Sequence, residues 1–126
     1  LAVTAEASEA EVRRALQTCL HEQAHRVISA RLERFSGRTD ARFAGWRLSS
    51  ARTQWGSCSP DGRVRLNWRL IHFSTPVIDY VIAHELAHLR ELNHSPRFWR
   101  EVARLLPGFE PARDQIKRVE VGAISF

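Results

Sequence analysis

Apolar positions recur every three to four residues in the first part of the chain, which predicts a long amphipathic helix. The residues that form this apolar face are Val12, Leu16, Cys19, Leu20, Ala24, Val27, Ile28 and Phe35. Ser8 and Glu11 form a capping-box pattern, because each side chain can satisfy a free amide at a helix start. We expect the helix to end near Gly37, since glycine can adopt the left-handed conformation that terminates a helix.

The next segment alternates apolar and polar side chains, which is typical of half-buried strands. Residues 46–49 alternate in this way, and residues 63–68 do so again. The segment 59–62 between them reads Ser-Pro-Asp-Gly, a composition that favours a tight turn. We therefore expect a hairpin with residues 54–58 on its incoming arm, within a small antiparallel sheet.

Three further helices are predicted in the second half of the chain. The first covers residues 75–93, with Thr75 as its cap, and is apolar on nearly every side, as buried helices are. The second covers residues 96–106, with Ser95 as its cap. A short helix over residues 112–119 follows. Together these elements predict an α+β fold.

The composition agrees with a single compact domain. The chain has 126 residues, of which 44% are hydrophobic, and this size allows one core. We expect one domain over residues 1–126, as a fragment of a longer chain because it begins at Leu1. No apolar run reaches the length of a membrane span, and no signal peptide is visible, so we expect a cytoplasmic protein. In that reducing environment, Cys19 and Cys58 are expected to be free thiols.

The charge is positive and is carried almost entirely by arginine. The net charge is +5, and Lys117 is the one lysine among nineteen basic residues. Arginine prefers planar partners such as carboxylates and phosphates. The arginines are spread along the whole chain, however, which favours a solvated surface over a dedicated nucleic-acid site.

The chemistry is indicated by a H-E-x-x-H pattern on the predicted buried helix. His84 and His88 lie four residues apart, so both imidazoles project from one helix face and can bind one metal ion. Glu85 is placed to accept a proton from a water molecule. Burying these three side chains among apolar neighbours would be costly without a cation.

A second copy of the pattern lies on the first helix, from His21 to His25. There His25 and Glu22 fall on the polar side, and no third ligand follows nearby. We interpret this copy as part of a solvated helix face.

His94 is the leading candidate for a third ligand of the metal. A break in the helix at Asn93 would let the chain turn and bring His94 back towards His84 and His88. Glu91 and Glu101 are the carboxylate alternatives. Three neutral histidines would leave a position open for water, which is the arrangement of catalytic zinc sites.

Several motifs together resemble the YgjP-like metallopeptidase domain, a bacterial zincin-like family related in motif style to the SprT-like and WLM proteases. The residues that carry the resemblance are 55–58 (WGSC), 66–70 (LNWRL), 77–88 (VIDYVIAHELAH) and 93–99 (NHSPRFW). The resemblance implies a zincin-like fold, zinc on His84, His88 and His94, and Glu85 as general base. It also implies a zinc-dependent hydrolase that acts on peptides or proteins.

Two other activities remain open at this point. The metal centre could hydrolyse a small anionic substrate or nucleotide, with Arg63, Arg65, Arg69 and Arg97 as candidates for the rim that holds it. The domain could instead be a DNA-associated module of the SprT-like kind. For the peptidase, the strand around residues 55–58 could form a rim along which an extended substrate binds.

Overall fold

The computed structural model describes residues 8–39 and 43–124. It contains the helices α1 (Glu9–Ser36), α2 (Thr75–Ala87), α3 (Pro96–Leu105) and α4 (Glu110–Lys117), and the short 3-10 helices η1 (Trp68–His72) and η2 (Val121–Ala123). The strands are β1 (Gly45–Ser49), β2 (Gly56–Cys58) and β3 (Arg63–Asn67). The predicted α+β class is confirmed.

The three strands form one mixed sheet in the order β1-β3-β2. The predicted hairpin is present, because β2 and β3 pair antiparallel with Ser57 opposite Arg65. The expectation of a purely antiparallel sheet is wrong, since β1 pairs parallel to β3. The physical reason is that β3 inserts between two consecutive strands: the connection from β1 to β2 spans the width of a strand and leaves room for β3.

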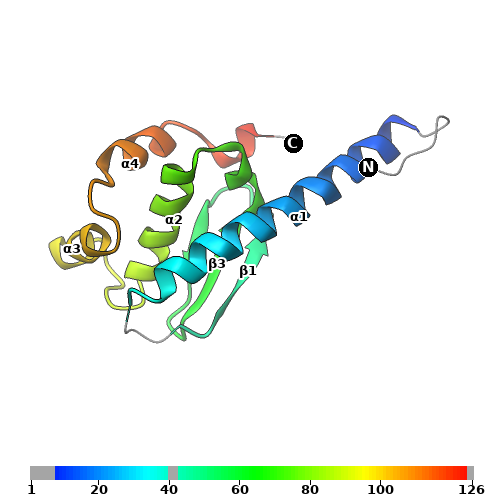
Figure 1. Cartoon of the computed structure of the whole chain (residues 1–126). Coiled ribbons are helices and arrows are strands. Elements are labelled where there is room, and N and C mark those ends of the chain that lie inside the picture. Colours follow the sequence, from blue (N-terminus) through cyan, green and yellow to red (C-terminus); the bar gives the residue numbers. More distant parts are fainter. Residues whose placement is uncertain (1–7, 40–42, 125–126) are drawn as a thin grey trace.

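The helix α2 lies at the centre of the molecule, as its apolar sequence predicts. It packs against α1, α3, α4 and the sheet (Figure 1). Its residues Val77, Ile82, Ala83 and Leu86 are fully buried, and they join Phe98 of α3 in the core. Side chains on α2 are therefore held by neighbours on several sides, which gives a rigid base for a site.

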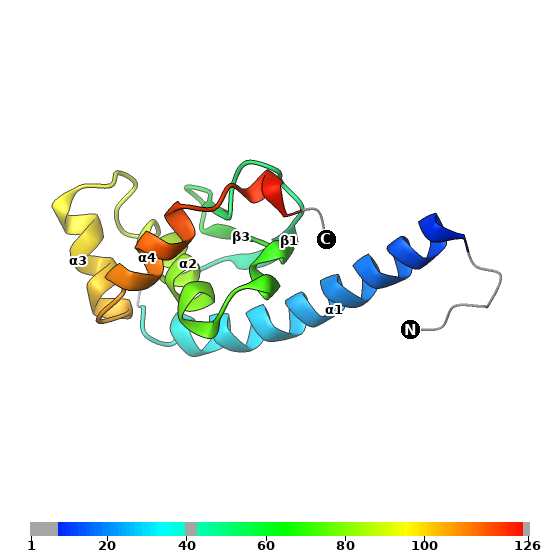
Figure 2. The ribbon, with the colours of Figure 1, turned by 90° about the horizontal axis from the view of Figure 1, so that it is seen from above.

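The long helix α1 is buried only over its second half. Ala24, Ile28, Leu32 and Phe35 lie in the core, whereas the first turns extend beyond the rest of the molecule (Figures 1 and 2). The predicted cap is present, because the Ser8 hydroxyl accepts a hydrogen bond from the Glu11 amide at 3.2 Å.

The predicted end of α1 is correct in position and wrong in conformation. Gly37 follows the last helical residue, but its φ is −69°, in the right-handed region. Its amide donates to the Phe35 carbonyl, so the helix ends in a tightened turn that does not need glycine's left-handed freedom.

The helix α2 ends earlier than predicted, at Ala87 instead of Asn93. The chain from His88 onwards forms turns, with the Leu89 amide bonded to the Leu86 carbonyl at 3.0 Å. Two more helical turns would stabilise little, because Leu92 is 65% exposed and has no core to pack against. No helix in the described part of the chain is long and apolar enough to cross a membrane.

An ion pair fixes α1 against α2, and the sequence analysis gave it no role. Arg31 donates two hydrogen bonds to the carboxylate of Asp79, from Nε at 2.8 Å and from Nη2 at 2.6 Å. Asp79 is buried and lies less than two helical turns before His84, so this contact helps set the position of α2.

Candidate metal centre

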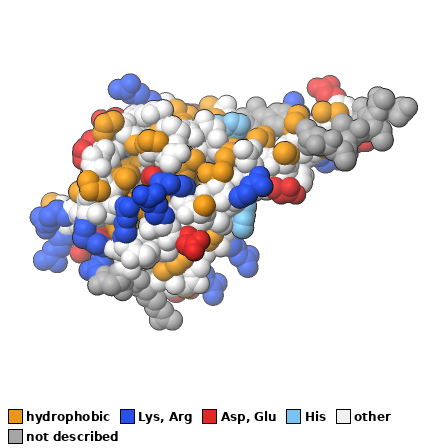
Figure 3. All heavy atoms as spheres, in the orientation of Figure 1, with side chains coloured by type: hydrophobic (Ala, Val, Ile, Leu, Met, Phe, Trp, Pro, Cys, Tyr) orange, Lys and Arg blue, Asp and Glu red, His pale blue; other side chains and the backbone are white. Residues whose placement is uncertain are grey.

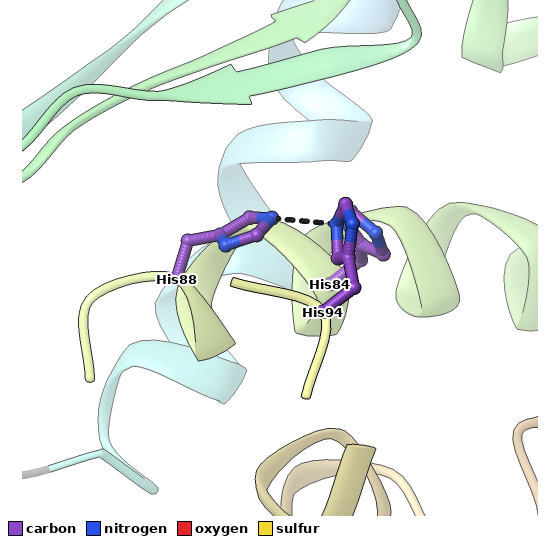
Figure 4. Close-up of side chains that lie close together, drawn as sticks. All are labelled: His84, His88 and His94. Atoms are coloured by element: carbon purple, nitrogen blue, oxygen red, sulfur yellow. Dashed lines mark hydrogen bonds between the residues drawn. The ribbon is translucent and has the colours of Figure 1, made fainter. Parts of the chain in front are cut away.

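The three predicted histidines lie together at the end of α2. His84 and His88 project from one face of the helix, and His94 approaches from the connection between α2 and α3 (Figure 4). One ring nitrogen from each of them lies within 4.8 Å of the others. The early end of α2 produces this arrangement, because a continued helix would carry His94 away from the other two.

The spacing of two of the nitrogens fits a tetrahedral metal ion. Zinc bound to imidazole at about 2.0–2.1 Å separates two of its ligand nitrogens by about 3.4 Å. The Nε2 atoms of His88 and His94 are 3.2 Å apart. The three side chains present borderline nitrogen donors and no thiolate, so a divalent transition ion such as zinc suits them.

The orientation of His88 also suits a metal ligand. Its Nδ1 lies 3.0 Å from the backbone carbonyl of Glu91, so an Nδ1–H can donate there and leave the Nε2 lone pair for a metal. Burial lowers the pKa of His88, which favours the neutral imidazole that binds metals.

Glu85 lies on the side of α2 that faces the sheet and is 5% exposed. Its Oε2 atom is 3.2 Å from Nδ1 of His84. Gly56 of β2 packs directly on it: a Cβ at Gly56 would lie 2.8 Å from the Glu85 Cγ atom and 2.9 Å from Oε2. Only a glycine lets β2 approach the carboxylate this closely.

The two carboxylate alternatives lie outside the histidine cluster. Glu91 contributes its backbone carbonyl to His88, as described above. The Glu101 carboxylate on α3 accepts hydrogen bonds from Nε of Arg104 at 3.1 and 3.2 Å, and it also lies 3.8 Å from Arg90. Neither joins the three nitrogens that could hold a metal.

The second H-E-x-x-H copy does not form a cluster of this kind. The ring of His21 packs on Trp68 at 4.6 Å, and the ring of His25 stacks on Trp46 at 5.0 Å. Glu22 and His25 are exposed, as predicted for a solvated face. The two imidazoles therefore serve as packing partners for separate tryptophans.

A groove of about 850 Å³ begins at His84 and Glu85. It is lined by the loop before β2 together with Gly56, by Tyr80 and Val81 of α2, and by α4 and the residues that follow it. The residues that line it include Arg52, Trp55, Trp99, Arg113, Lys117 and Glu120.

None of the four arginines considered for an anion-binding rim lines this groove. Arg63 and Arg65 lie on the sheet and border a separate hollow there. Arg69 is buried, and Arg97 is exposed on α3. Basic side chains are scattered over the visible surface, with several at the end that carries α3 (Figure 3). The cations in the groove are instead Arg52, Arg113 and Lys117, which the sequence analysis missed.

Buried polar side chains hold the loop that forms the β2 wall. Asn67 donates to the carbonyls of Ala51 at 2.7 Å and Gln54 at 3.0 Å. Arg69 donates to the carbonyl of Ile124 at 2.8 Å, which ties the end of the described chain to the same region. Both residues belong to the LNWRL motif, so the motif was visible in the sequence although its structural role was not.

Aromatic rings line the groove next to His84. Tyr80 lies 5.9 Å from the His84 ring and stacks on Phe109 at 6.0 Å. Burial raises the pKa of Tyr80 to about 12, so the phenol keeps its proton at neutral pH. Burial likewise raises the pKa of Cys58 to about 11, which argues against a nucleophilic thiolate there.

Comparisons with known proteins agree with this geometry. Residues 1–119 match the family described as the YgjP-like metallopeptidase domain. A solved structure, the metallopeptidase zymogen of Pyrococcus abyssi abylysin, is 25% identical and superposes with a TM-score of 0.62, over 71% of this chain and 90% of that chain. A comparison with the curated proteins finds no match.

Proposed function

The chain belongs to the YgjP-like metallopeptidase domain family, and on that premise we propose that it is a zinc-dependent peptidase whose ligands are His84, His88 and His94. The observation that carries the proposal is the convergence of their three ring nitrogens within 4.8 Å. Two of them come from one helix face and the third from a separate turn, so the cluster depends on the tertiary fold.

Zinc bound to these residues would polarise the scissile carbonyl and lower the pKa of a water molecule in the open fourth position. The chain itself has to move the proton. Glu85 is next to His84 and faces the groove, so its carboxylate can accept the proton of the attacking water and return it to the leaving amine. Its burial against Gly56 keeps the carboxylate in one position.

The edge of the sheet offers a way to hold an extended peptide. The strand β2 is the outer strand, and its pairing with β3 turns the backbone groups of Gly56 and Cys58 towards the free edge. A substrate that adds to this edge as another strand would lie across Glu85 and His84. This arrangement supports a peptide substrate over a small anionic one.

Zinc content is the first test of the site. We expect about one zinc per chain in the purified protein, strongly reduced in His94→Ala and unchanged in His25→Ala, as measured by elemental analysis. The control removes a histidine of the second H-E-x-x-H copy, whose ring packs on Trp46. Equal zinc in both variants would contradict the proposed ligand set.

Turnover tests the role of Glu85. The variant Glu85→Gln keeps the size of the side chain and should retain zinc, while hydrolysis of an unstructured protein such as casein falls by at least about a hundredfold. The comparison is made at equal zinc content. Undiminished hydrolysis by Glu85→Gln would rule out Glu85 as the base.

A further inference from the structure

Three basic side chains face the groove beside the candidate metal centre. Arg113 and Lys117 lie four residues apart on α4, so they project from one face of this helix. Arg52 also lines the groove, from the loop before β2. The surface between them is apolar and includes Trp55, Val81, Trp99 and Ile116.

Arg113 is separated from the metal centre by a single aromatic ring. Its guanidinium lies 5.5 Å from the centre of the Trp99 ring, and the Trp99 ring lies 6.1 Å from the ring of His84. An extended peptide advances about 3.4 Å per residue. Measured through the Trp99 ring, this path corresponds to about three residues of extended chain, so a substrate group held by Arg113 would belong to a residue within about three positions of the scissile bond.

The positive charge in this part of the groove is only partly neutralised. Arg113 contacts Asp114 at 3.1 Å, but both side chains are partly exposed, so this pair is weak. No carboxylate within ion-pairing distance of Arg52 or Lys117 is found among the described residues. Burial lowers the pKa of Arg69, and the nearby charge of Arg52 lowers it further. Glu120 is the one other carboxylate besides Glu85 in the lining.

We propose that this groove selects substrates with a carboxylate within about three residues of the scissile bond, bound by Arg52, Arg113 and Lys117. The proposal rests on the proposed peptidase function and adds the substrate class to it. Arginine binds a carboxylate with two parallel hydrogen bonds. The same chemistry fits an acidic side chain or a free C-terminus.

A set of matched peptides distinguishes the two sources of the carboxylate. In a series of fluorogenic peptides, Glu or Gln would be placed in turn at each of about three positions on either side of the scissile bond. Each peptide would be made both with a free C-terminal acid and with a C-terminal amide. We expect kcat/KM to fall at least about tenfold when the preferred carboxylate is removed. If kcat/KM falls when Glu is replaced by Gln, the bound carboxylate is an acidic side chain. If kcat/KM falls when the C-terminus is amidated, the bound carboxylate is the free C-terminus.

Charge reversal tests the residues. In the double variant Arg52→Glu and Lys117→Glu, the preference should invert in favour of peptides with Lys in place of Glu. Both side chains are exposed, so the fold should tolerate the change. Arg100→Glu, on α3 and away from the groove lining, is the control and should keep the wild-type preference. Equal cleavage of acidic and neutral peptides by the wild type would overturn the proposal.

A peptide-binding measurement tests the proposed selectivity independently of peptidase activity. Zinc-loaded Glu85→Gln is titrated with the labelled acidic and neutral peptides, and fluorescence anisotropy reports affinity without turnover. Tighter binding of the carboxylate peptide supports the proposed selectivity of the groove. If the wild type at the same time cleaves no peptide, only the peptidase proposal fails. Equal affinities for both peptides contradict the selectivity.

Discussion

The contact between Gly56 and Glu85 shows how one atom can control the candidate base. The Oε2 atom of Glu85 lies 2.9 Å from the point where a Cβ at Gly56 would be, and the Arg65 carbonyl is 3.1 Å from that same point. Because backbone on one side and the carboxylate on the other leave no free space, a methyl group there has to displace one of them. The side chain of Glu85 is the part that can move.

We therefore predict that Gly56→Ala reduces kcat by about a hundredfold while the protein keeps its zinc. A displacement of the carboxylate by about 1 Å is sufficient for such a loss, and steady-state kinetics with zinc analysis measures both quantities. Gly37→Ala is the control, because a Cβ there would meet its nearest neighbour at 3.9 Å. Full activity in Gly56→Ala would mean that Glu85 does not need its observed position.

Individual residues of the site were predictable where local spacing determines them. The distance of four residues places His84 and His88 on one face of any helix, and the polar Asn93 and the capping Ser95 indicated that the chain turns at His94. Zinc binding by this cluster stays a prediction. The closeness of Gly56 to Glu85 could not be predicted, because it depends on how the sheet lies on α2.

At the scale of elements, the start of α3 determines where His94 lies. The hydroxyl of Ser95 accepts a hydrogen bond from the Phe98 amide at 3.4 Å, so Ser95 caps the helix directly after His94. Phe98 is fully buried and packs against the rings of His88 at 4.5 Å and His94 at 4.8 Å. The first turn of α3 is therefore a support for the histidine cluster.

The variant Ser95→Ala should lower stability by about 1 kcal/mol, the usual contribution of a helix cap. The loss of the cap should also weaken zinc binding, by up to about fivefold, because His94 is less firmly held. Competition with a chromophoric chelator measures this affinity. Ser8→Ala removes the corresponding cap at the projecting end of α1 and should leave zinc affinity unchanged. An equal loss of affinity in both variants would contradict a local support role for α3.

The elements themselves were largely predictable, and their ends and pairing were less so. Caps such as Ser8 and Ser95 are local signals, and both act as predicted. The end of α2 and the parallel pairing of β1 depend on what the neighbouring segments can bury. Periodicity within one segment holds no information about a distant partner.

At the scale of the whole molecule, the Arg31–Asp79 pair joins the long α1 to the helix that carries the candidate site. The carboxylate of Asp79 is buried, and both of its oxygens accept hydrogen bonds from Arg31. Hydrogen bonds to charged groups contribute more to stability than neutral ones, and a partner left unpaired on a buried helix is costly.

We predict that Asp79→Asn lowers the free energy of unfolding by roughly 1–3 kcal/mol, since the guanidinium of Arg31 loses its charged partner. Chemical denaturation monitored by circular dichroism gives this value. Asp114→Asn breaks the partly exposed contact with Arg113 and should change stability by no more than about 0.5 kcal/mol. Comparable losses in the two variants would show that burial does not strengthen the Arg31 contact.

The groove is the feature that the sequence could not predict. Arg52, Tyr80 and Arg113 belong to three separate segments, and no spacing rule relates them. The arginines that the sequence suggested lie elsewhere, because the fold turns Arg65 towards solvent and buries Arg69. Long-range packing decides which charges meet.

The open edge at β2 also has a consequence for solubility. An unpaired edge that accepts a substrate strand could equally accept the same strand of another copy, which is how edge-to-edge aggregation begins. Here β2 is three residues long and is followed closely by Pro60, which has no amide hydrogen to donate. The edge is thus long enough for a bound segment of peptide and too short to template a growing sheet.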